Sequence, residues 1–76
     1  MSKPTRITNS IRALRFARGE MTQAELAERI GVTRQTVIAI EQGRYSPSLE
    51  MAFQISRVFN VPLDEVFQYP DGEGEP

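Results

Sequence analysis

The chain has 76 residues, of which 39% are hydrophobic and 25% are charged, and its formal net charge is −1. This length fits one small domain and leaves no room for a separate substrate-binding domain. The lack of cysteine excludes disulfides and thiolate metal sites, and the lack of histidine removes the commonest metal ligand and general base. We therefore expect no metal and no cofactor.

Other classes of protein are disfavoured as well. No apolar run approaches the about 20 residues of a membrane-spanning helix, and residues 1–6 lack the apolar stretch of a signal peptide. We therefore expect a cytoplasmic location. The sequence contains no recognisable pair of carboxylates and no nucleophile with a neighbouring base, so we do not expect an enzyme.

The charges are unevenly distributed along the chain. Residues 1–45 carry eight basic and four acidic side chains, a net charge of +4, whereas residues 46–76 carry one basic and six acidic side chains, a net charge of −5. This asymmetry indicates a basic side for nucleic acid and an acidic far side, unless it arises by chance in a short chain.

The first part of the chain predicts an arm, a strand and a helix. Residues 1–6 form an N-terminal arm, and residues 5–9 are compatible with a short strand. Asn9 and Ser10 are both good residues to cap a helix that begins next to them. The apolar positions of this helix are Ile11, Leu14 and Ala17, and Gly19 ends it.

Residues 23–43 have the pattern of a helix-turn-helix. Thr22 and Glu25 form a capping box at the start of a helix whose apolar residues, Leu26, Ala27 and Ile30, recur at helical spacing. Gly31 can adopt the left-handed conformation that ends this helix.

The second helix of the motif runs from about 33 to 42. Val32 is placed to fill the corner between the two helices, and Thr33 can cap the second one. Val37 and Ile40 return to helical spacing, and Gly43 stops the helix.

Two more helices are expected after a loop over 44–47. One begins near Ser48 and ends at Asn60, and its apolar face is Leu49, Ala52, Ile55 and Phe59. A short helix has Pro62 in its first turn. Residues 67–69 are compatible with a strand, and residues 70–76 form an acidic flexible tail.

The first four helices are expected to bury a core of their own. Its predicted members are Ile11, Leu14, Leu26, Ile30, Val37, Ile40, Ala52, Ile55 and Phe59. The last helix is too short to be stable alone, so its apolar residues need a docking surface on the earlier helices or on a partner.

The chain resembles the lambda-repressor-like, Cro/C1-type (XRE) DNA-binding family over residues 7–67. The similarity rests on blocks that match in order and spacing: residues 11–15, 21–27, 31–37, 40–43 and 47–49. The resemblance implies an all-α, five-helix domain over 7–69, in which short terminal strands can pair into a small antiparallel sheet. Family members usually repress transcription, often as dimers on palindromic operators. The turn at Gly19-Glu20-Met21 is one residue longer than usual in the family.

The outward side of the second motif helix is expected to read DNA bases. With Val37, Ile40 and Glu41 pointing inward, the residues left for the major groove are Arg34, Gln35, Ile38 and Ala39. Arginine suits guanine, and glutamine suits adenine. Ile38 could contact a thymine methyl group or pack at the edge of the domain.

Phosphate contacts are expected on both sides of the groove. The candidates are Gln23, Thr33, Thr36, Arg44 and Tyr45. Gln23 and Thr33 lie at helix starts, where free N–H groups and the helix dipole favour an anion. Arg44 could instead be a solvated loop charge. The resemblance further implies a structural ion pair between Arg15 and Glu41.

Surplus apolar residues near the C-terminus indicate a homodimer. Met51 and Phe53 exceed what one helix face needs, so they either complete the core or join an exposed patch. The predicted interface comprises Leu63, Phe67, Tyr69, Met51 and Phe53. One small module seldom reads enough base pairs to be specific, which also favours a dimer.

The sequence thus predicts a sequence-specific regulator of transcription, and specifically a repressor, that binds double-stranded DNA. One alternative is the DNA-binding antitoxin of a toxin–antitoxin pair, which the acidic tail permits. A second is a protein-interaction module that has lost DNA binding, against which the intact Gln23, Arg34 and Gln35 argue.

Overall fold

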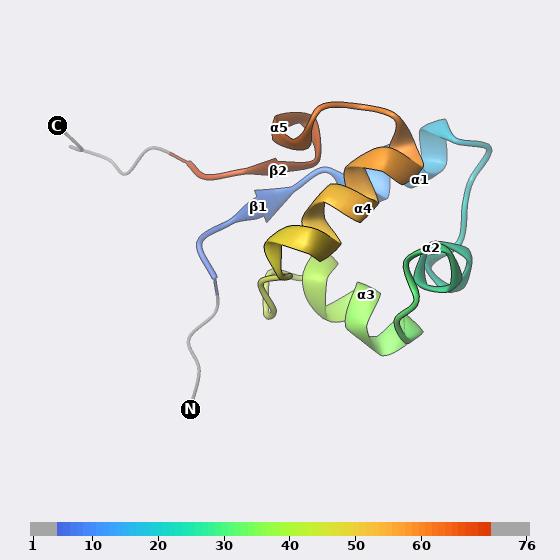
Figure 1. The fold of residues 1–76 in the computed structure, drawn as a ribbon, viewed down its shortest axis with the longest axis horizontal. Coiled ribbons are helices and arrows are strands. Elements are labelled where there is room, and N and C mark those ends of the chain that lie inside the picture. Colours follow the sequence, from blue (N-terminus) through green and yellow to red (C-terminus); the bar gives the residue numbers. More distant parts are fainter. Residues whose placement is uncertain (1–4, 71–76) are drawn as a thin grey trace, which may run out of the picture.

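The structure is a computed structural model that describes residues 5–70. The tail predicted over 70–76 lies almost wholly outside the described residues, as does most of the N-terminal arm. Within these described residues, five helices and two short strands follow one another (Figure 1): β1 Thr8–Asn9, α1 Ile11–Ala17, α2 Gln23–Ile30, α3 Arg34–Glu41, α4 Leu49–Phe59, α5 Leu63–Val66 and β2 Phe67–Gln68. The predicted all-α, five-helix architecture is confirmed.

The small sheet expected from the two ends of the domain is present. β1 and β2 pair antiparallel, with Thr8 opposite Gln68 and Asn9 opposite Phe67. The Ser10 N–H extends this contact by donating to the Val66 carbonyl at 2.8 Å. This two-stranded ribbon lies at one side of the helices, beside α4 and α5 (Figure 1). The first and last elements of the described chain are therefore joined directly.

Side-chain caps begin three of the helices, as the sequence predicted. Thr22 and Glu25 form the full capping box of α2, with bonds of 3.0 and 2.8 Å. Thr33 and Ser48 accept backbone N–H groups at the starts of α3 and α4. Pro62 differs slightly from expectation, because it occupies the N-cap position just before α5, without a side-chain cap bond, and is not part of the first turn.

The turn between α1 and α2 is the one that is a residue longer than usual in the family that the sequence resembles. Gly19 and Glu20 both have left-handed backbone angles, with φ of 74° and 60°. The N–H groups of Glu20 and Met21 return to carbonyls of α1. As a result Met21 reaches the core, where it is buried although the sequence did not place it there.

The core lies between the helices and contains most of the predicted residues. Its buried members are Ile11, Met21, Leu26, Ala27, Ile30, Val37, Ile40, Ile55, Phe59 and Val66. Leu14 is only partly buried against this cluster, and Ala17 is exposed.

Leu49 was wrongly assigned to the inward face of α4, because its side chain is 68% exposed. Helical side chains point toward the N-terminus of their helix. Leu49 is the first residue of α4, so its side chain projects past the helix start and finds no neighbouring helix to cover it.

Of the two docking surfaces that the sequence left open for the last helix, the structure shows the earlier helices for Val66. Val66 is fully buried and belongs to the core cluster, so α5 contributes to it. A four-residue helix has no stability of its own. Packing of Val66 and pairing of β2 with β1 together hold α5 in place.

Within residues 5–70, none of the five helices is long and apolar enough to cross a bilayer.

Replacing Val66 by alanine tests the role of α5. We expect Val66→Ala to lower the free energy of unfolding by about 2 kcal/mol, from lost burial and a residual cavity. Chemical denaturation followed by circular dichroism measures it. Leu49→Ala on the neighbouring helix is the control and should change stability by less than about 0.5 kcal/mol. Equal effects of the two variants would contradict the assignment of Val66 to the core.

Candidate nucleic-acid interface

The first and second helices of the motif meet at a tight corner. Gly31 ends α2 in the left-handed conformation, with φ of 75°. The Val32 N–H then donates to the Ala27 carbonyl at 3.0 Å, and the Val32 side chain packs against the core. Ala27 is buried between the packed helices, where its small side chain permits a close approach. The turn therefore sets the angle between α2 and α3.

α3 presents different chemistry at its two faces. Val37 and Ile40 are buried, whereas Arg34 and Gln35 are exposed in the first turn. Ile38 and Ala39 are half-buried, so they are less prominent than the sequence suggested. The exposed side chains nearest the start of α3 are thus a guanidinium and an amide, the groups that can bond to base edges.

The N-terminal end of α3 is favourable to anions. Thr33 Oγ1 accepts the Thr36 N–H at 3.2 Å, and the two hydroxyl oxygens are 3.0 Å apart. The first turn of this helix contains no acidic residue. The remaining free N–H groups and the helix dipole can therefore attract a phosphate.

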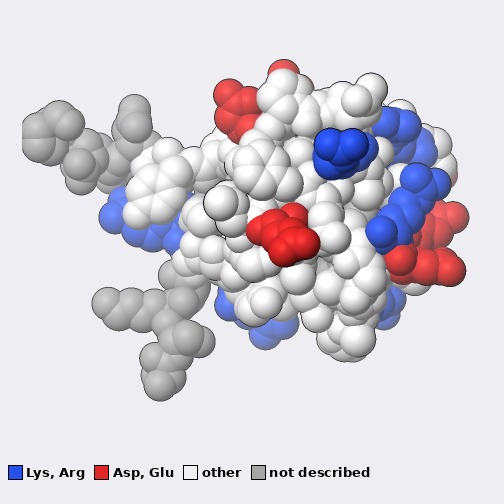
Figure 2. Space-filling model, in the orientation of Figure 1, with Lys and Arg blue, Asp and Glu red and all other residues white. Residues whose placement is uncertain are grey.

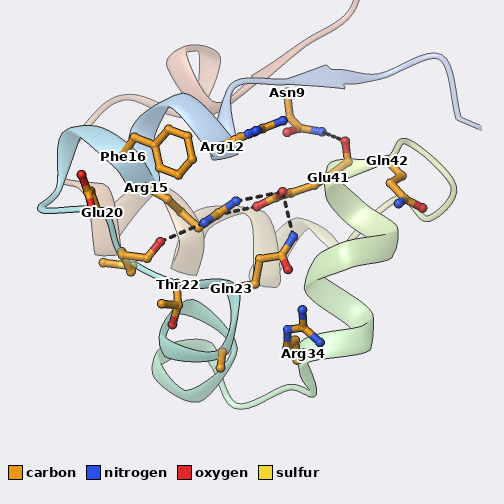
Figure 3. A pocket seen from close by; sticks show the side chains of 12 residues that line it. Asn9, Arg12, Arg15, Phe16, Glu20, Thr22, Gln23, Arg34, Glu41 and Gln42 are labelled. Atoms are coloured by element: carbon orange, nitrogen blue, oxygen red, sulfur yellow. Dashed lines mark hydrogen bonds and ion pairs between the residues drawn. The ribbon is translucent and has the colours of Figure 1, made fainter.

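A buried ion pair joins α1 to the last residue of α3 (Figure 3). Arg15 Nε donates to Glu41 Oε2 at 2.7 Å, and Arg15 Nη2 donates to Glu41 Oε1 at 3.2 Å. Arg15 Nη1 also donates to the Met21 carbonyl at 2.9 Å. The two side chains are only 8% and 10% exposed. Two parallel bonds of this kind fix orientation as well as distance.

Gln23 extends this pair to α2. Its Nε2 donates to Glu41 Oε1 at 3.2 Å, which connects the first residue of α2 to the last residue of α3. Sequence reasoning treated Gln23 only as a phosphate contact, because nothing in the local pattern indicates a tertiary partner. Its second amide hydrogen is still free to bind an anion. The ion pair lies beside an open hollow of about 710 Å³, whose rim includes Arg12 and Arg34.

Asn9 is a further residue whose role the sequence did not reveal. Its Nδ2 donates to the carbonyls of Ile40 at 3.0 Å and Glu41 at 3.4 Å, at the end of α3. Its Oδ1 accepts the Ile11 N–H at 3.1 Å. Ser10 is the N-cap residue of α1 but makes no side-chain cap bond, so Asn9 alone of the two predicted capping residues bonds the start of α1. The other bonds of Asn9 span more than thirty positions of the sequence.

The loop after α3 carries the remaining predicted phosphate contacts. Arg44 and Tyr45 are exposed there, and the Arg44 N–H returns to the Ala39 carbonyl at 3.0 Å. The predicted segregation of charge is not evident on the face in Figure 2, where basic and acidic groups lie side by side. Within residues 5–70, no three acidic side chains are grouped to hold a metal ion.

Four of the five predicted dimer residues line a second, apolar hollow of about 530 Å³. These are Phe53, Leu63, Phe67 and Tyr69; Ile7 joins them, although the sequence did not identify it. Phe53 is 49% and Tyr69 66% exposed. Met51 instead packs against the core. We call the surface formed by Ile7, Phe53, Leu63, Phe67 and Tyr69 the apolar hollow.

The two packed helices, their left-handed corner and the exposed first turn of α3 define a helix-turn-helix protein. Residues 11–66 match the family model described as helix-turn-helix, and the chain belongs to this family. The family predicted from the sequence motifs is thereby confirmed.

Several archaeal relatives are similar over most of the domain. An uncharacterized HTH-type transcriptional regulator of Methanocaldococcus jannaschii is 51% identical over 53 residues, which are 70% of this chain and 80% of the relative. Another, of Methanothermobacter thermautotrophicus, is 70% identical over 48 residues, which are 62% of this chain and 70% of the relative.

A bacterial relative and a solved structure extend the comparison. The chain is 37% identical over 59 residues to a cryptic phage transcriptional repressor of Vibrio cholerae, covering 78% of this chain and 52% of the relative. The crystal structure of a candidate DNA-binding protein from Bacteroides fragilis superposes with a TM-score of 0.71 at 24% identity, covering 82% of this chain and 98% of that one. This last similarity establishes the shared fold.

Removing the carboxylate of the buried pair should destabilise the domain strongly. Glu41→Ala leaves the Arg15 charge buried without its partner, and we expect a loss of about 3–5 kcal/mol in the free energy of unfolding. Urea denaturation measures it. Glu28→Ala, at an exposed position of α2, is the control and should change little. A loss below about 1 kcal/mol for Glu41→Ala would mean that the pair acts as a solvated surface contact.

Proposed function

We propose that this protein is a sequence-specific repressor of transcription that reads the major groove of double-stranded DNA with α3. The observation that carries the proposal is the exposed pair Arg34 and Gln35 on the first turn of α3. The opposite face of the same helix is anchored by Val37 and Ile40 in the core. A helix that packs on the core through one face and has polar side chains at its exposed start is suited to the groove.

The chemistry of the exposed residues suggests which bases they read. The Arg34 guanidinium can bond to O6 and N7 of guanine, and the Gln35 amide to N6 and N7 of adenine. Ile38 and Ala39 are half-buried, and we assign them apolar contact with thymine methyl groups beside these bonds.

Contacts with phosphates are assigned to the ends of the two motif helices. Thr33, Thr36 and the start of α3 would bind one phosphate, and Gln23 at the start of α2 would bind another through its free amide hydrogen. Arg44 and Tyr45 would extend the contact beyond α3. Such contacts set the register of the protein on DNA and carry no sequence information.

Repression is favoured over activation by the Vibrio cholerae relative, which is named a transcriptional repressor. Occupying an operator requires neither catalysis nor a cofactor. The proposal places the protein in the cytoplasm, with DNA as its partner.

The two kinds of DNA contact can be separated by mutation. We expect Arg34→Ala and Gln35→Ala each to cost about 1–3 kcal/mol of affinity on the selected operator and to relax the preference at one base position. Arg44→Ala should instead weaken all sequences about equally. Selection of bound DNA from a random pool, followed by fluorescence anisotropy, measures both effects. An unchanged consensus for Arg34→Ala would contradict the assignment of α3 as the reading helix.

We further propose that the protein binds a palindromic operator as a homodimer formed through the apolar hollow. The hollow brings exposed Phe53 and Tyr69 next to Leu63 and Phe67, which is unusual for a surface that remains in water. A two-fold axis would pair this surface with its own copy. On a palindromic operator the two reading helices would have to lie about 34 Å apart, one turn of DNA.

Phe53 provides a test of the dimer that leaves the core intact. We expect Phe53→Ser to weaken dimerisation by about 2 kcal/mol, as for a central aromatic residue of an interface, with unchanged helix content. Sedimentation equilibrium measures the dimer dissociation constant, and circular dichroism measures the helix content. Leu49→Ser, at an exposed leucine of the same helix outside the hollow, is the matched control. A wild-type protein that is strictly monomeric at micromolar concentration, with and without DNA, would contradict the dimer.

A further inference from the structure

The end of α3 is held by two different groups from two different elements. Arg15 of α1 binds the Glu41 carboxylate, and Asn9 of β1 binds the last backbone carbonyls of the helix. The Ile40 carbonyl also accepts the Gly43 N–H at 3.1 Å, just beyond the helix. Both carbonyls belong to the negative end of the helix dipole, so an amide N–H is a favourable additional ligand for them. Figure 3 shows Asn9 above this end of α3, on the opposite side of Glu41 from Gln23.

Asn9 also belongs to the ribbon that borders the apolar hollow. Its partner in the β1–β2 pairing is Phe67, and Phe67 lines the hollow. The neighbouring Ser10 is bonded to Val66 of α5. A single side chain therefore spans the distance between the strand that borders the hollow and the helix that carries Arg34 and Gln35.

We propose that Asn9 is a positioning residue that makes the orientation of α3 depend on what occupies the apolar hollow. The inference rests on the proposed function, since it takes α3 as the reading helix and a second copy of this chain as the occupant. When Phe67 packs against the partner, β2 and its neighbour β1 become fixed. Asn9 then holds the end of α3 in one position.

The geometry of α3 makes its orientation sensitive to this bond. Eight residues give a helix of about 12 Å, so a tilt of about 10° at its end moves the first turn by about 2 Å. Hydrogen bonds to base edges tolerate only a few tenths of an ångström. Loss of the Asn9 contact should therefore impair base reading more than phosphate binding.

The decisive variant is Asn9→Asp. The carboxylate has the same shape and can still accept the Ile11 N–H, but it cannot donate to the α3 carbonyls and it repels them. Because the variant adds a negative charge near DNA, its control is Thr8→Asp. Thr8 is exposed at the adjacent position of β1, and among the described residues 5–70 its side chain bonds only Gln68. Asn9→Ser is a neutral second variant, whose shorter side chain can still cap α1.

The first measurement compares affinities for the selected operator and for mixed-sequence DNA, at a temperature at which circular dichroism shows each variant to be folded. We expect Asn9→Asp and Asn9→Ser to lose at least tenfold more affinity on the operator than on mixed-sequence DNA. Thr8→Asp should lose affinity by the same factor for the operator and for mixed-sequence DNA. A purely structural role would lower the melting temperature and leave the ratio of the two affinities unchanged, and that result would overturn the inference.

The second measurement tests whether the orientation of α3 depends on what occupies the apolar hollow. The amides of Gln42, Gly43 and Arg44 are bonded to carbonyls of α3 and report the state of its end. We expect their hydrogen exchange in the wild type to slow as the protein concentration is raised through the dimer dissociation constant, and to show no such dependence in Asn9→Ser.

The two proposals fail in different ways. A wild type that selects no DNA sequence or forms no dimer would overturn the proposed function, and the inference with it. A wild type that selects an operator as a dimer, while exchange at the end of α3 is independent of concentration, would overturn the inference alone.

Discussion

The buried pair of Arg15 and Glu41 is the interaction on which the arrangement of α3 depends. Removing two charges from water is unfavourable, and it is tolerated only where hydrogen bonds satisfy both groups. Here Arg15 also binds the Met21 carbonyl, and Glu41 also accepts Gln23. Within residues 5–70, no buried polar side-chain atom lacks a hydrogen-bond partner. The pair thus holds α1, α2 and α3 at one point, and its value lies in orientation more than in net stability.

α3 is consequently held by hydrogen bonds at its C-terminal end, whereas its N-terminal end is exposed. Its last residues are bonded through the Glu41 side chain and, at the backbone, through Asn9. Its first turn exposes Arg34 and Gln35 beside free N–H groups. Eight residues are enough for both, because the buried Val37 and Ile40 lie on the side away from the exposed Arg34 and Gln35. The same division explains why Ile38 and Ala39, at its flanks, are half-buried.

A domain of this size buries a limited share of its surface, so each terminal segment matters. The ribbon of β1 and β2 and the short α5 complete the core through Val66. They also leave several apolar side chains without cover, and these form the apolar hollow. The elements that close the fold are therefore also the elements that form this exposed apolar surface.

Local patterns in the sequence were sufficient for the helices, their caps and the helix-turn-helix itself. The capping box at Thr22, the left-handed Gly31 and the inward Val37 and Ile40 depend only on residues a few positions apart. The antiparallel ribbon and the Arg15–Glu41 pair came from family resemblance, which carries tertiary information that periodicity lacks.

Only the tertiary structure decided the contacts between distant segments. Burial of Val66, exposure of Leu49, the bond from Gln23 to Glu41 and the reach of Asn9 to the end of α3 all depend on how whole helices are placed. Helical spacing shows which side chains share a face of a helix. It does not show which part of that face is covered by neighbouring helices. An amide side chain can bond to any carbonyl within reach, so its partner is determined only when the chain has folded.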